Sequence, residues 1–439
     1  MKIPPVKGTR DLYPERFAPI RRIFEVWRSV SLRHGFEEFE GPTLELLDLY
    51  REKSGDEIVG QLYRLTDAGG RELALRPEMT PSLARMVAAR INTLPRPIKW
   101  FCMPKLFRGE NVQRGRLREF FQWNVDVIGT ADVIGDAECI LVGVEALSEL
   151  GLSDSDFVVQ ISNRRLIAAL LSAAGIAESA HGGAYALMDK AGKLDAAELS
   201  RRWEAAYGEQ ISYAALSDLL SAGDLDSLRS AAGGIGGETA ELASALDETS
   251  RLFTLLQDFG IIEFCELNLR IVRGLAYYTG PVFEFYDRSE QHRAICGGGR
   301  YDDLLGKLGK KPEPAVGFGM GDVVLSLILD ERGLLTADRP ARAVFVADAA
   351  EGLRDRLHRV VVALRRAGIT TEFSYTQSAL AKQLKAADKH GCAFTIILGD
   401  ETRRQDLVQI KDMAGGQRRD VRLEDLLAEP ETFLQSQAS

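Results

Sequence analysis

Apolar and polar side chains alternate along the stretch from Leu117 to Gly129. Phe121, Trp123, Val125 and Val127 fall on one side of an extended chain, and Arg118, Gln122, Asn124 and Asp126 fall on the other. Successive side chains of a strand point to opposite faces, so the pattern predicts a strand with one core face and one polar face. Turn residues fill the preceding Gly109–Gly115 segment, which predicts an antiparallel hairpin that starts near Lys99.

A helical period governs residues 15–33. Apolar side chains recur there every three or four positions, at Phe17, Ile20, Phe24 and Trp27, with Ile23, Val26 and Val30 alongside them. Pro14 stands where a helix begins. This pattern predicts an amphipathic helix. Residues 35–50 then read as a short strand, a Gly41-Pro42 break and another helical stretch.

Strand and helix patterns continue to about residue 330. Leu73–Met86 predicts a strand that turns into a helix, with Thr80 as its N-cap and Pro81 in its first turn. A strand is predicted at Val158–Asn163, and segments rich in alanine and leucine predict helices from about 175 to 250. Sheet patterns return at Leu267–Asp287 and Pro314–Leu329.

Gly317, Gly319 and Gly321 mimic a dinucleotide-binding fingerprint. The fingerprint needs a second βαβ unit and an acidic strand end, and neither follows here, so we exclude NAD as a ligand. A composition change at Asp330–Ala343 predicts a linker at residues 331–342. Beyond it, residues 343–439 alternate strands and helices in the manner of a small α/β binding domain with a mainly parallel sheet.

The amino-acid composition restricts the number of domains and the cellular compartment that we expect. The chain has 439 residues, 45% of them hydrophobic and 27% charged, which suits two or three globular domains. Its formal net charge of -9 means that any RNA contact must come from local patches. The five cysteines are scattered and never in C-x-x-C spacing, which fits a reducing compartment and gives no zinc motif. Because we find no signal peptide and no apolar run near the ~18 residues of a membrane span, we expect a cytoplasmic protein without membrane association.

Cationic side chains concentrate around the predicted hairpin. They are Lys99, Lys105, Arg108, Arg114, Arg116 and Arg118, with Glu110 as the only early carboxylate. A guanidinium group donates two hydrogen bonds to a phosphate in a fixed fork, so several of them could clamp a polyphosphate. A solvated, charged hairpin without a ligand is the alternative that the pattern leaves open.

The hairpin residues resemble motif 2 of class II aminoacyl-tRNA synthetases, specifically that of the histidyl-tRNA synthetase family. The matching residues are Arg108-Gly-Glu110, Gln113-Arg114 and Gly115-Arg116-Leu-Arg118-Glu-Phe120-Phe-Gln122. Residues 35–50 resemble motif 1, residues 314–329 resemble motif 3, and Arg273-Gly-Leu-Ala-Tyr277-Tyr278 resembles the histidine-specific motif. Four motifs in this order, spread over nearly the whole chain, are far more specific than any one of them.

This resemblance implies an α+β fold. We expect a class II synthetase-like antiparallel sheet in a catalytic domain at residues 1–330, a helical insertion at about 175–250, and a small C-terminal α/β domain of the anticodon-binding kind at residues 343–439. It also implies that ATP activates histidine to histidyl-adenylate and that the histidyl group passes to tRNA(His). Mg²⁺ would screen the phosphates, and motif 1 would build a homodimer.

Roles for individual residues follow from the same resemblance. Arg108 and Arg273 would be catalytic, on either side of the α-phosphorus. Histidine would contact Glu78, Thr80, Arg108, Gln122, Asp126, Arg273, Tyr277 and Tyr278. ATP would contact Arg108, Glu110, Arg118 and Phe120, and the tRNA acceptor would contact Gln113, Arg114 and Arg116. No residue is expected to bind a metal directly.

Three positions depart from the family pattern. Ala276 and Asp126 stand where the family usually has Asp and Glu, and Val324 stands where an arginine commonly braces the terminal phosphates of ATP. Either another cation replaces that arginine or the nucleotide binds differently. The loss favours a second interpretation, a catalytically silent paralogue that senses histidine as the regulatory subunit of ATP phosphoribosyltransferase. The intact Arg108-x-Glu110, the basic loop, Arg273 and the C-terminal domain argue against it.

Overall fold

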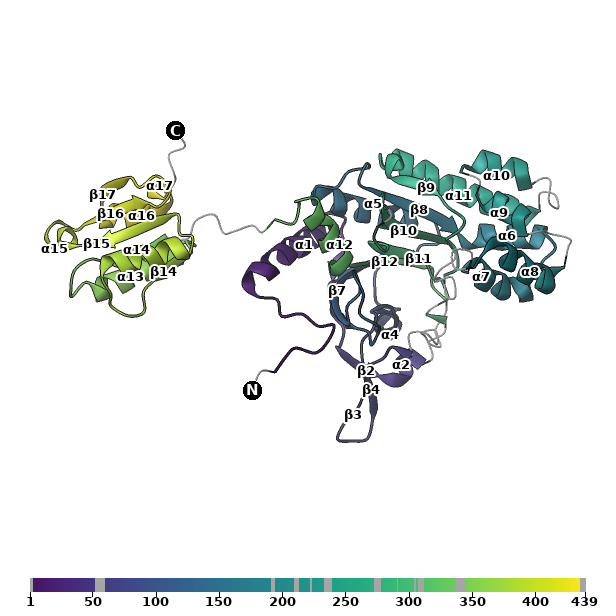
Figure 1. Cartoon of the computed structure of the whole chain (residues 1–439), viewed down its shortest axis with the longest axis horizontal. Helices are drawn as coiled ribbons and strands as arrows, with labels where there is room; N and C mark the ends of the chain where they lie inside the picture. The colour runs from purple at the N-terminus through teal and green to yellow at the C-terminus, as the bar shows by residue number, and fades with distance from the viewer. Residues whose placement is uncertain are drawn as a thin grey trace. The chain divides into compact units, whose positions relative to one another are not determined.

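The computed structural model describes residues 3–51, 60–190, 194–208, 213–221, 223–232, 239–271, 278–289, 291–303, 305–306, 312–336 and 344–434. The chain divides into two compact units, Met1–Ala337 and Asp338–Ser439. Helices and sheets are mixed in both units (Figure 1), which confirms the predicted α+β class.

A nine-stranded sheet forms the centre of the first unit. Its strand order is β1 (Glu37–Glu38), β5 (Ile98–Cys102), β7 (Glu119–Ile128), β12 (Ala315–Gly321), β11 (Cys296–Arg300), β10 (Pro281–Asp287), β8 (Phe157–Asn163) and β9 (Cys265–Leu267), and β6 (Lys105–Phe107) also pairs with β7. The pairs β1/β5 and β8/β9 are parallel, and the others are antiparallel. The alternation read in the sequence is therefore that of β7, beside the centre of this sheet.

One face of the sheet is covered by α1 (Pro14–Arg33), α5 (Ile134–Glu149) and α12 (Asp322–Glu331), as Figure 1 shows. Trp27 of α1 stacks on Trp123 of β7 with 5.7 Å between ring centroids. The Trp123 Nε1–H group donates to Ser31 Oγ at 3.0 Å, so the buried indole keeps a hydrogen bond. Trp123, Val125 and Val127 thus fill the core, and the polar side chains of β7 face the opposite side of the sheet.

A three-stranded antiparallel sheet of order β2-β4-β3 adjoins this centre. Its strands are β2 (Leu44–Leu46), β4 (Glu72–Leu75) and β3 (Arg64–Thr66), and α2 (Leu47–Arg51) and α4 (Thr80–Arg90) flank it. The N-cap predicted at Thr80 is wrong. Thr80 opens α4, and the N-cap is Met79, whose side chain makes no hydrogen bond to the first turn. Pro81 in the first turn supplies the start signal instead.

A helical segment follows β8. It comprises α6 (Arg164–Ala173), the 3₁₀ turn η1 (Glu178–Ala180), α7 (His181–Met188), α8 (Ala196–Tyr207), α9 (Tyr213–Leu220), α10 (Leu225–Ala232), α11 (Ala240–Asp258) and the 3₁₀ turn η2 (Ile262–Phe264). Its helices share an apolar core that includes Trp203 and reaches Val282 of β10. Across the described residues no single helix is long and apolar enough to cross a membrane; the bent pair Arg164–Ala173 and Glu178–Met188, angled at 120°, meets the length and composition requirement together.

The second unit holds a five-stranded sheet of order β14-β13-β15-β16-β17. The strands are β13 (Val344–Asp348), β14 (Thr371–Phe373), β15 (Phe394–Leu398), β16 (Leu407–Asp412) and β17 (Arg418–Arg422), and the helices are α13 (Arg354–Arg366), α14 (Leu380–Lys389), α15 (Asp400–Gln405), α16 (Leu423–Ala428) and α17 (Pro430–Phe433). The prediction of a mainly parallel sheet is wrong, because β15/β16 and β16/β17 are antiparallel while β13/β14 and β13/β15 are parallel. The β16–β17 hairpin has a polar, exposed second strand that gives no apolar alternation.

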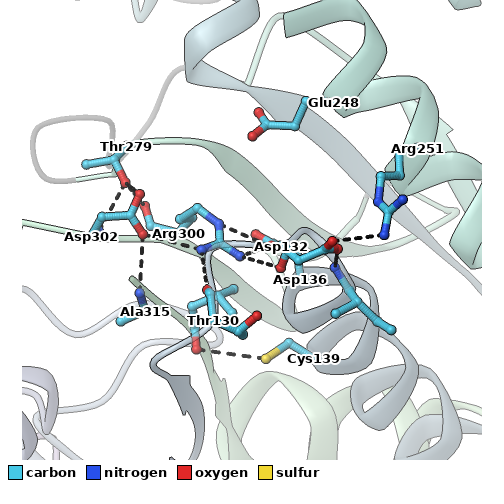
Figure 2. A network of polar contacts seen from close by, with 12 residues as sticks. Thr130, Asp132, Asp136, Cys139, Glu248, Arg251, Thr279, Arg300, Asp302 and Ala315 are labelled. Atoms are coloured by element: carbon cyan, nitrogen blue, oxygen red, sulfur yellow. Dashed lines mark hydrogen bonds and ion pairs between the residues drawn. The ribbon is translucent and has the colours of Figure 1, made fainter. Parts of the chain in front are cut away.

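A buried ion pair ties β11 to α5 (Figure 2). Arg300 and Asp136 are both 0% exposed and are joined by two contacts, one of them from Arg300 Nε to Asp136 Oδ2 at 3.1 Å. The guanidinium also donates to the carbonyl oxygens of Thr130 at 2.9 Å and Asp132 at 3.1 Å. The backbone of Arg300 accepts from the Thr279 N–H at 2.7 Å. This network therefore fixes the start of β10 against β11 and α5.

We expect the substitution Asp136→Asn to lower the free energy of unfolding of the first unit by about 3–5 kcal/mol, because it leaves a buried guanidinium without its counter-charge. Urea unfolding followed by tryptophan fluorescence measures the loss. The matched control is Asp247→Asn, since Asp247 pairs with Arg229 where both side chains are half-exposed or more; its cost should stay below about 1 kcal/mol. Equal costs for the two variants would contradict this role of the buried pair.

Candidate active site

The open face of the sheet carries two cavities that share a wall. One has a volume of 160 Å³ and the other of 520 Å³. Arg108, Gln122, Gly297 and Gly319 line both of them. The two cavities are therefore parts of one cleft over β7, β11 and β12.

The smaller cavity has the size of an amino-acid side chain and a polar lining. Glu78 and Thr80, at the start of α4, form one wall, and Gln122, Asn124 and Asp126 of β7 form its floor together with glycines of β12. Tyr278 and Tyr301 complete the lining. Six of the residues predicted to contact histidine thus line one cavity: Glu78, Thr80, Arg108, Gln122, Asp126 and Tyr278.

Glycines on β12 leave space for the polar side chains of β7. A Cβ at Gly317 would lie 2.2 Å from Asp126 Oδ1, and a Cβ at Gly319 would lie 2.7 Å from Gln122 Nε2. Both distances are too short for any other residue unless the carboxylate or the amide moves. The glycine spacing that mimicked a dinucleotide fingerprint therefore shapes the floor of the smaller cavity.

Asp126 is the buried end of the smaller cavity, with 6% of its surface exposed. The Tyr301 hydroxyl donates to Asp126 Oδ1. Burial raises the pKa of Asp126 to about 7, because removal from water disfavours the charged carboxylate, and the Tyr301 hydrogen bond lowers the pKa against that effect. Asp126 consequently changes its charge near neutral pH in the ligand-free protein.

The larger cavity is lined by the hairpin and by the first turn of α12. The hairpin contributes Arg108, Glu110, Arg116 and Phe120, and α12 contributes Val323 and Val324. Arg108 Nε donates to the carbonyl of Pro77 at 2.9 Å, and its guanidinium lies over the Phe120 ring, 5.3 Å from the centroid. Glu110 is buried and forms an ion pair of 2.5 Å with Arg116. This wall thus combines an aromatic face with a cluster of guanidinium groups.

Other predicted site residues lie elsewhere. Arg118 is absent from the lining of both cavities among the described residues; its Nε donates to the Glu110 carbonyl and its backbone N–H to the Gly8 carbonyl, so it fastens the hairpin to the N-terminal segment. Arg114 contacts Glu331 at the end of α12. The backbones of Gln113 and Arg116 hydrogen-bond to each other across the turn of the hairpin. The predictions for Arg273 and Tyr277 fall outside the described residues.

Several lining residues were not predicted from the sequence. Asn124 and Tyr301 line the smaller cavity, and Glu284, His292 and Arg293 line the larger one. Asn124 could have been found, because it shares the polar face of β7 with Gln122 and Asp126. Glu284 lies on β10, and His292 and Arg293 precede β11, and no local pattern marks these three as neighbours of the hairpin.

Asp322 explains how α12 meets the hairpin strand. It is 0% exposed, accepts from the Phe121 N–H at 2.9 Å and pairs with Arg10 Nη2 at 2.7 Å. Its carboxylate is therefore turned toward β7 and the N-terminal segment. The two following residues, Val323 and Val324, present aliphatic side chains to the larger cavity.

A third cavity, of 540 Å³, lies between the helical segment and the sheet. Residues of α7, α8 and α9 line it, and it shares Glu284 and Tyr286 with the larger cavity of the cleft.

Within the part of the chain that the structure describes, no cluster of three or more His, Cys, Asp or Glu side chains is arranged to hold a metal ion.

Family models and sequence relatives of this chain all point to one protein family. Residues 8–322 match the family described as Histidyl-tRNA synthetase, and residues 343–430 match the Anticodon binding domain. The Histidine–tRNA ligase of Opitutus terrae is 39% identical over 427 residues, which are 96% of each chain. The chloroplastic/mitochondrial Histidine–tRNA ligase of Arabidopsis thaliana is 36% identical over 422 residues, 96% of this chain and 85% of that one.

Solved structures share the fold over the same length. The histidyl-tRNA synthetase from Nostoc sp. PCC 7120 superposes with a TM-score of 0.81 at 25% identity, covering 98% of this chain and 99% of that one. A Bacillus halodurans protein described as an ATP phosphoribosyltransferase regulatory subunit/histidyl-tRNA synthetase superposes with a TM-score of 0.74 at 26% identity, covering 91% and 100%. The class II synthetase-like fold predicted from the motifs is thereby confirmed. The chain belongs to the histidyl-tRNA synthetase family.

Proposed function

We propose that the protein activates histidine with ATP and transfers the histidyl group to tRNA. The observation that carries this proposal is the pairing of a side-chain-sized polar cavity with a larger, arginine-lined cavity, joined at Arg108 and Gln122. The histidine carboxylate attacks the α-phosphorus of ATP, a bond forms between that oxygen and phosphorus, and pyrophosphate leaves. A terminal ribose hydroxyl of tRNA then attacks the acyl carbon, and AMP leaves.

The smaller cavity suits an imidazole. The Asp126 carboxylate can accept a hydrogen bond from a ring N–H group, and Gln122 can pair with a second polar atom of the amino acid. Glu78 has the charge to hold the ammonium group at the cavity mouth, with Thr80 beside it. A competing amino acid that leaves these buried groups unpaired is rejected strongly, so the pocket can select histidine without a second, editing site.

The larger cavity suits a nucleotide. Phe120 offers a ring face for adenine, and Arg108, at the junction of the cavities, is placed to neutralise charge on the α-phosphate as it develops. Arg273 is proposed to act on the same phosphate. Because Arg108 is held by Pro77 and Phe120, it is pre-positioned and need not be ordered by the substrate.

Mg²⁺ is proposed to accompany the nucleotide. This ion is usually held by substrate phosphates and water with one or two carboxylates, and Glu110 and Glu284 supply carboxylates to the larger cavity. The residues present therefore fit the ion. When bound, Mg²⁺ screens the negative charge of the phosphates, while the guanidinium groups of the chain position them.

The remaining parts are proposed to serve tRNA. Arg114 and Gln113, at the tip of the hairpin, face the acceptor end; the helical segment, beside the cleft, is the insertion that covers it; and residues 343–439 bind the anticodon. We also propose a homodimer and a cytoplasmic location.

The regulatory alternative is not favoured, because the curated relatives described above are named as ligases over nearly their full length. Charging of tRNA would distinguish the two functions.

We expect the substitution Gln122→Ala to lower kcat/KM for histidine about hundredfold in histidine-dependent pyrophosphate exchange, because it removes hydrogen bonds made in a buried pocket. Gln409→Ala is the control, since Gln409 lies on β16 of the other unit and exchange needs no tRNA. Near-normal exchange in Gln122→Ala would refute the assigned role.

Arg273→Ala should abolish exchange by the same assay.

Histidine binding should weaken as the pH falls below about 7. The raised pKa of Asp126 means that its carboxyl group is protonated below this pH and ionised above it, and only the ionised form accepts a hydrogen bond at both oxygens. Between pH 8 and pH 6 the dissociation constant measured by calorimetry should rise about tenfold more in the unmodified protein than in Asp126→Asn. Identical pH profiles for the two proteins would show that Asp126 does not read the imidazole.

The two hairpin arginines should separate tRNA binding from activation. Arg114→Ala should raise KM for tRNA about threefold to tenfold with unchanged pyrophosphate exchange, because Arg114 contacts Glu331 and not the described lining of the cleft. Arg116→Ala should lower exchange itself, because Arg116 lines the cavity and pairs with buried Glu110. Arg71→Ala, in the exposed turn between β3 and β4, is the control. A loss of exchange in Arg114→Ala would contradict this division.

A further inference from the structure

Aromatic and basic side chains gather on the surface of the second unit, at one edge of its sheet. Phe373 ends the edge strand β14, and the ring of Tyr375 meets its ring edge to face, with 5.0 Å between centroids. On α13, the guanidinium groups of Arg354 and Arg365 lie over the Phe373 ring, 5.7 Å and 5.6 Å from its centroid, and His358 packs against it at 5.6 Å. We propose that these five residues, the Phe373 cluster, bind unpaired bases of the tRNA anticodon loop. The inference deepens the function proposed for residues 343–439 and rests on it.

The ring of Tyr375 gives the Phe373 cluster an open stacking surface. This residue is 85% exposed, although its ring touches Phe373. His358 and Arg365 are exposed as well, whereas Phe373 is partly buried. Unpaired bases of an RNA loop stack on aromatic rings and on guanidinium planes. The cluster therefore offers a base a stacking surface that is bordered by positive charge.

Helix α13 supplies the charge that a phosphate backbone requires. It carries five arginines and one aspartate, in a chain whose formal net charge is -9. Arg354, His358 and Arg365 follow the helical period, so they share one face of α13 and reach the same ring. An acidic protein binds RNA through such local basic patches. The basic face of α13 and the aromatic end of β14 thus form one surface with the chemistry of a nucleic-acid site.

The topology of the sheet places this surface where ligands of α/β sheets bind. The parallel strands lie in the order β14-β13-β15, and the chain passes from β13 to β14 and then across β13 to β15. The strand order reverses at β13, and open α/β sheets bind ligands at the carboxyl ends of their strands beside such a reversal. Arg354 connects two of these ends, because it contacts Asp348 at the end of β13, at 3.5 Å, and donates to the carbonyl of Ser374 after β14.

The two arginines of the cluster are already ordered without RNA. Arg365 donates to the carbonyl of Thr371 from Nε at 3.1 Å and from Nη2 at 2.7 Å, and Arg354 is held at Ser374. A guanidinium has five N–H donors, and these contacts use only some of them. Because the side chains are fixed beforehand, little conformational freedom is lost when a nucleotide binds.

The test compares Tyr375→Ala with Tyr375→Phe and Arg366→Ala in the full-length protein. Arg366 is exposed on α13 and is rotated by about 100° from Arg365, so its variant is a matched control for the loss of charge alone. Tyr375→Ala should weaken binding of a tRNA(His) transcript, measured by filter binding, about fivefold to hundredfold, because one base loses its stacking partner. Tyr375→Phe should stay within twofold, since it keeps the ring, and Arg366→Ala should lose less than about threefold.

Two further measurements separate this role from a structural one. Thermal unfolding and histidine-dependent pyrophosphate exchange of Tyr375→Ala should match those of the unmodified protein, because the side chain is exposed and exchange needs no tRNA. Charging of an acceptor-stem minihelix, which lacks the anticodon loop, should also be unchanged, while KM for the whole tRNA rises with the loss of affinity.

Three results would overturn the inference. The first is a Tyr375→Ala variant that binds the tRNA transcript within twofold of the unmodified protein. The second is an equal loss in charging of the minihelix, which would place the effect away from the anticodon. The third is an Arg366→Ala variant that loses as much affinity as Tyr375→Ala, which would mean that only overall charge matters. Failure of the proposed function looks different, because the unmodified chain would then charge neither the tRNA nor the minihelix.

Discussion

The active cleft depends on a single constraint, that one face of an antiparallel sheet is packed while the other is kept open. The packed face is filled by Trp123 of β7 against Trp27 of α1. On the open face, Gly317 and Gly319 remove the side chains that would occupy the space of Asp126 and Gln122. Burial on one side and glycine on the other together create a rigid polar floor, and rigid floors are what selective pockets require.

The buried pair of Arg300 and Asp136 extends this rigidity to the segment before β10. Arg300 precedes Tyr301, which donates to Asp126, and its backbone holds Thr279, next to Tyr278. Two lining residues of the smaller cavity are thus fixed by an interaction that lies outside it. A charge pair removed from water is costly unless it is fully hydrogen-bonded, and here the surrounding carbonyl groups share that task.

The pattern of apolar residues predicted individual strands and helices of the fold. The alternation of β7 and the helical period of α1 predicted these two elements, whereas the α+β class and the six candidates that line the smaller cavity came from the resemblance of the motifs to a known family. The prediction of a mainly parallel sheet in the second unit was wrong because β16 pairs antiparallel with both β15 and β17, and β17 is exposed and charged, so no apolar alternation marks it. Arg118 was expected at ATP, which stays a prediction; its Nε donates to the Glu110 carbonyl and its backbone N–H donates to the Gly8 carbonyl, and no local pattern shows these contacts. Glu284 reaches the cleft through strand register, which is a property of the whole sheet.

The segment ahead of α1 supports the walls of the cleft through Gly8 and Arg10, although it does not line the cleft itself. Gly8 accepts from the backbone of the hairpin strand, and Arg10 reaches Asp322 at the start of α12. Shortening the protein at its amino end would therefore leave every lining side chain in the sequence and still free two of the cleft's walls from each other. Truncation of these first residues is therefore expected to loosen the cleft without removing any side chain that lines it.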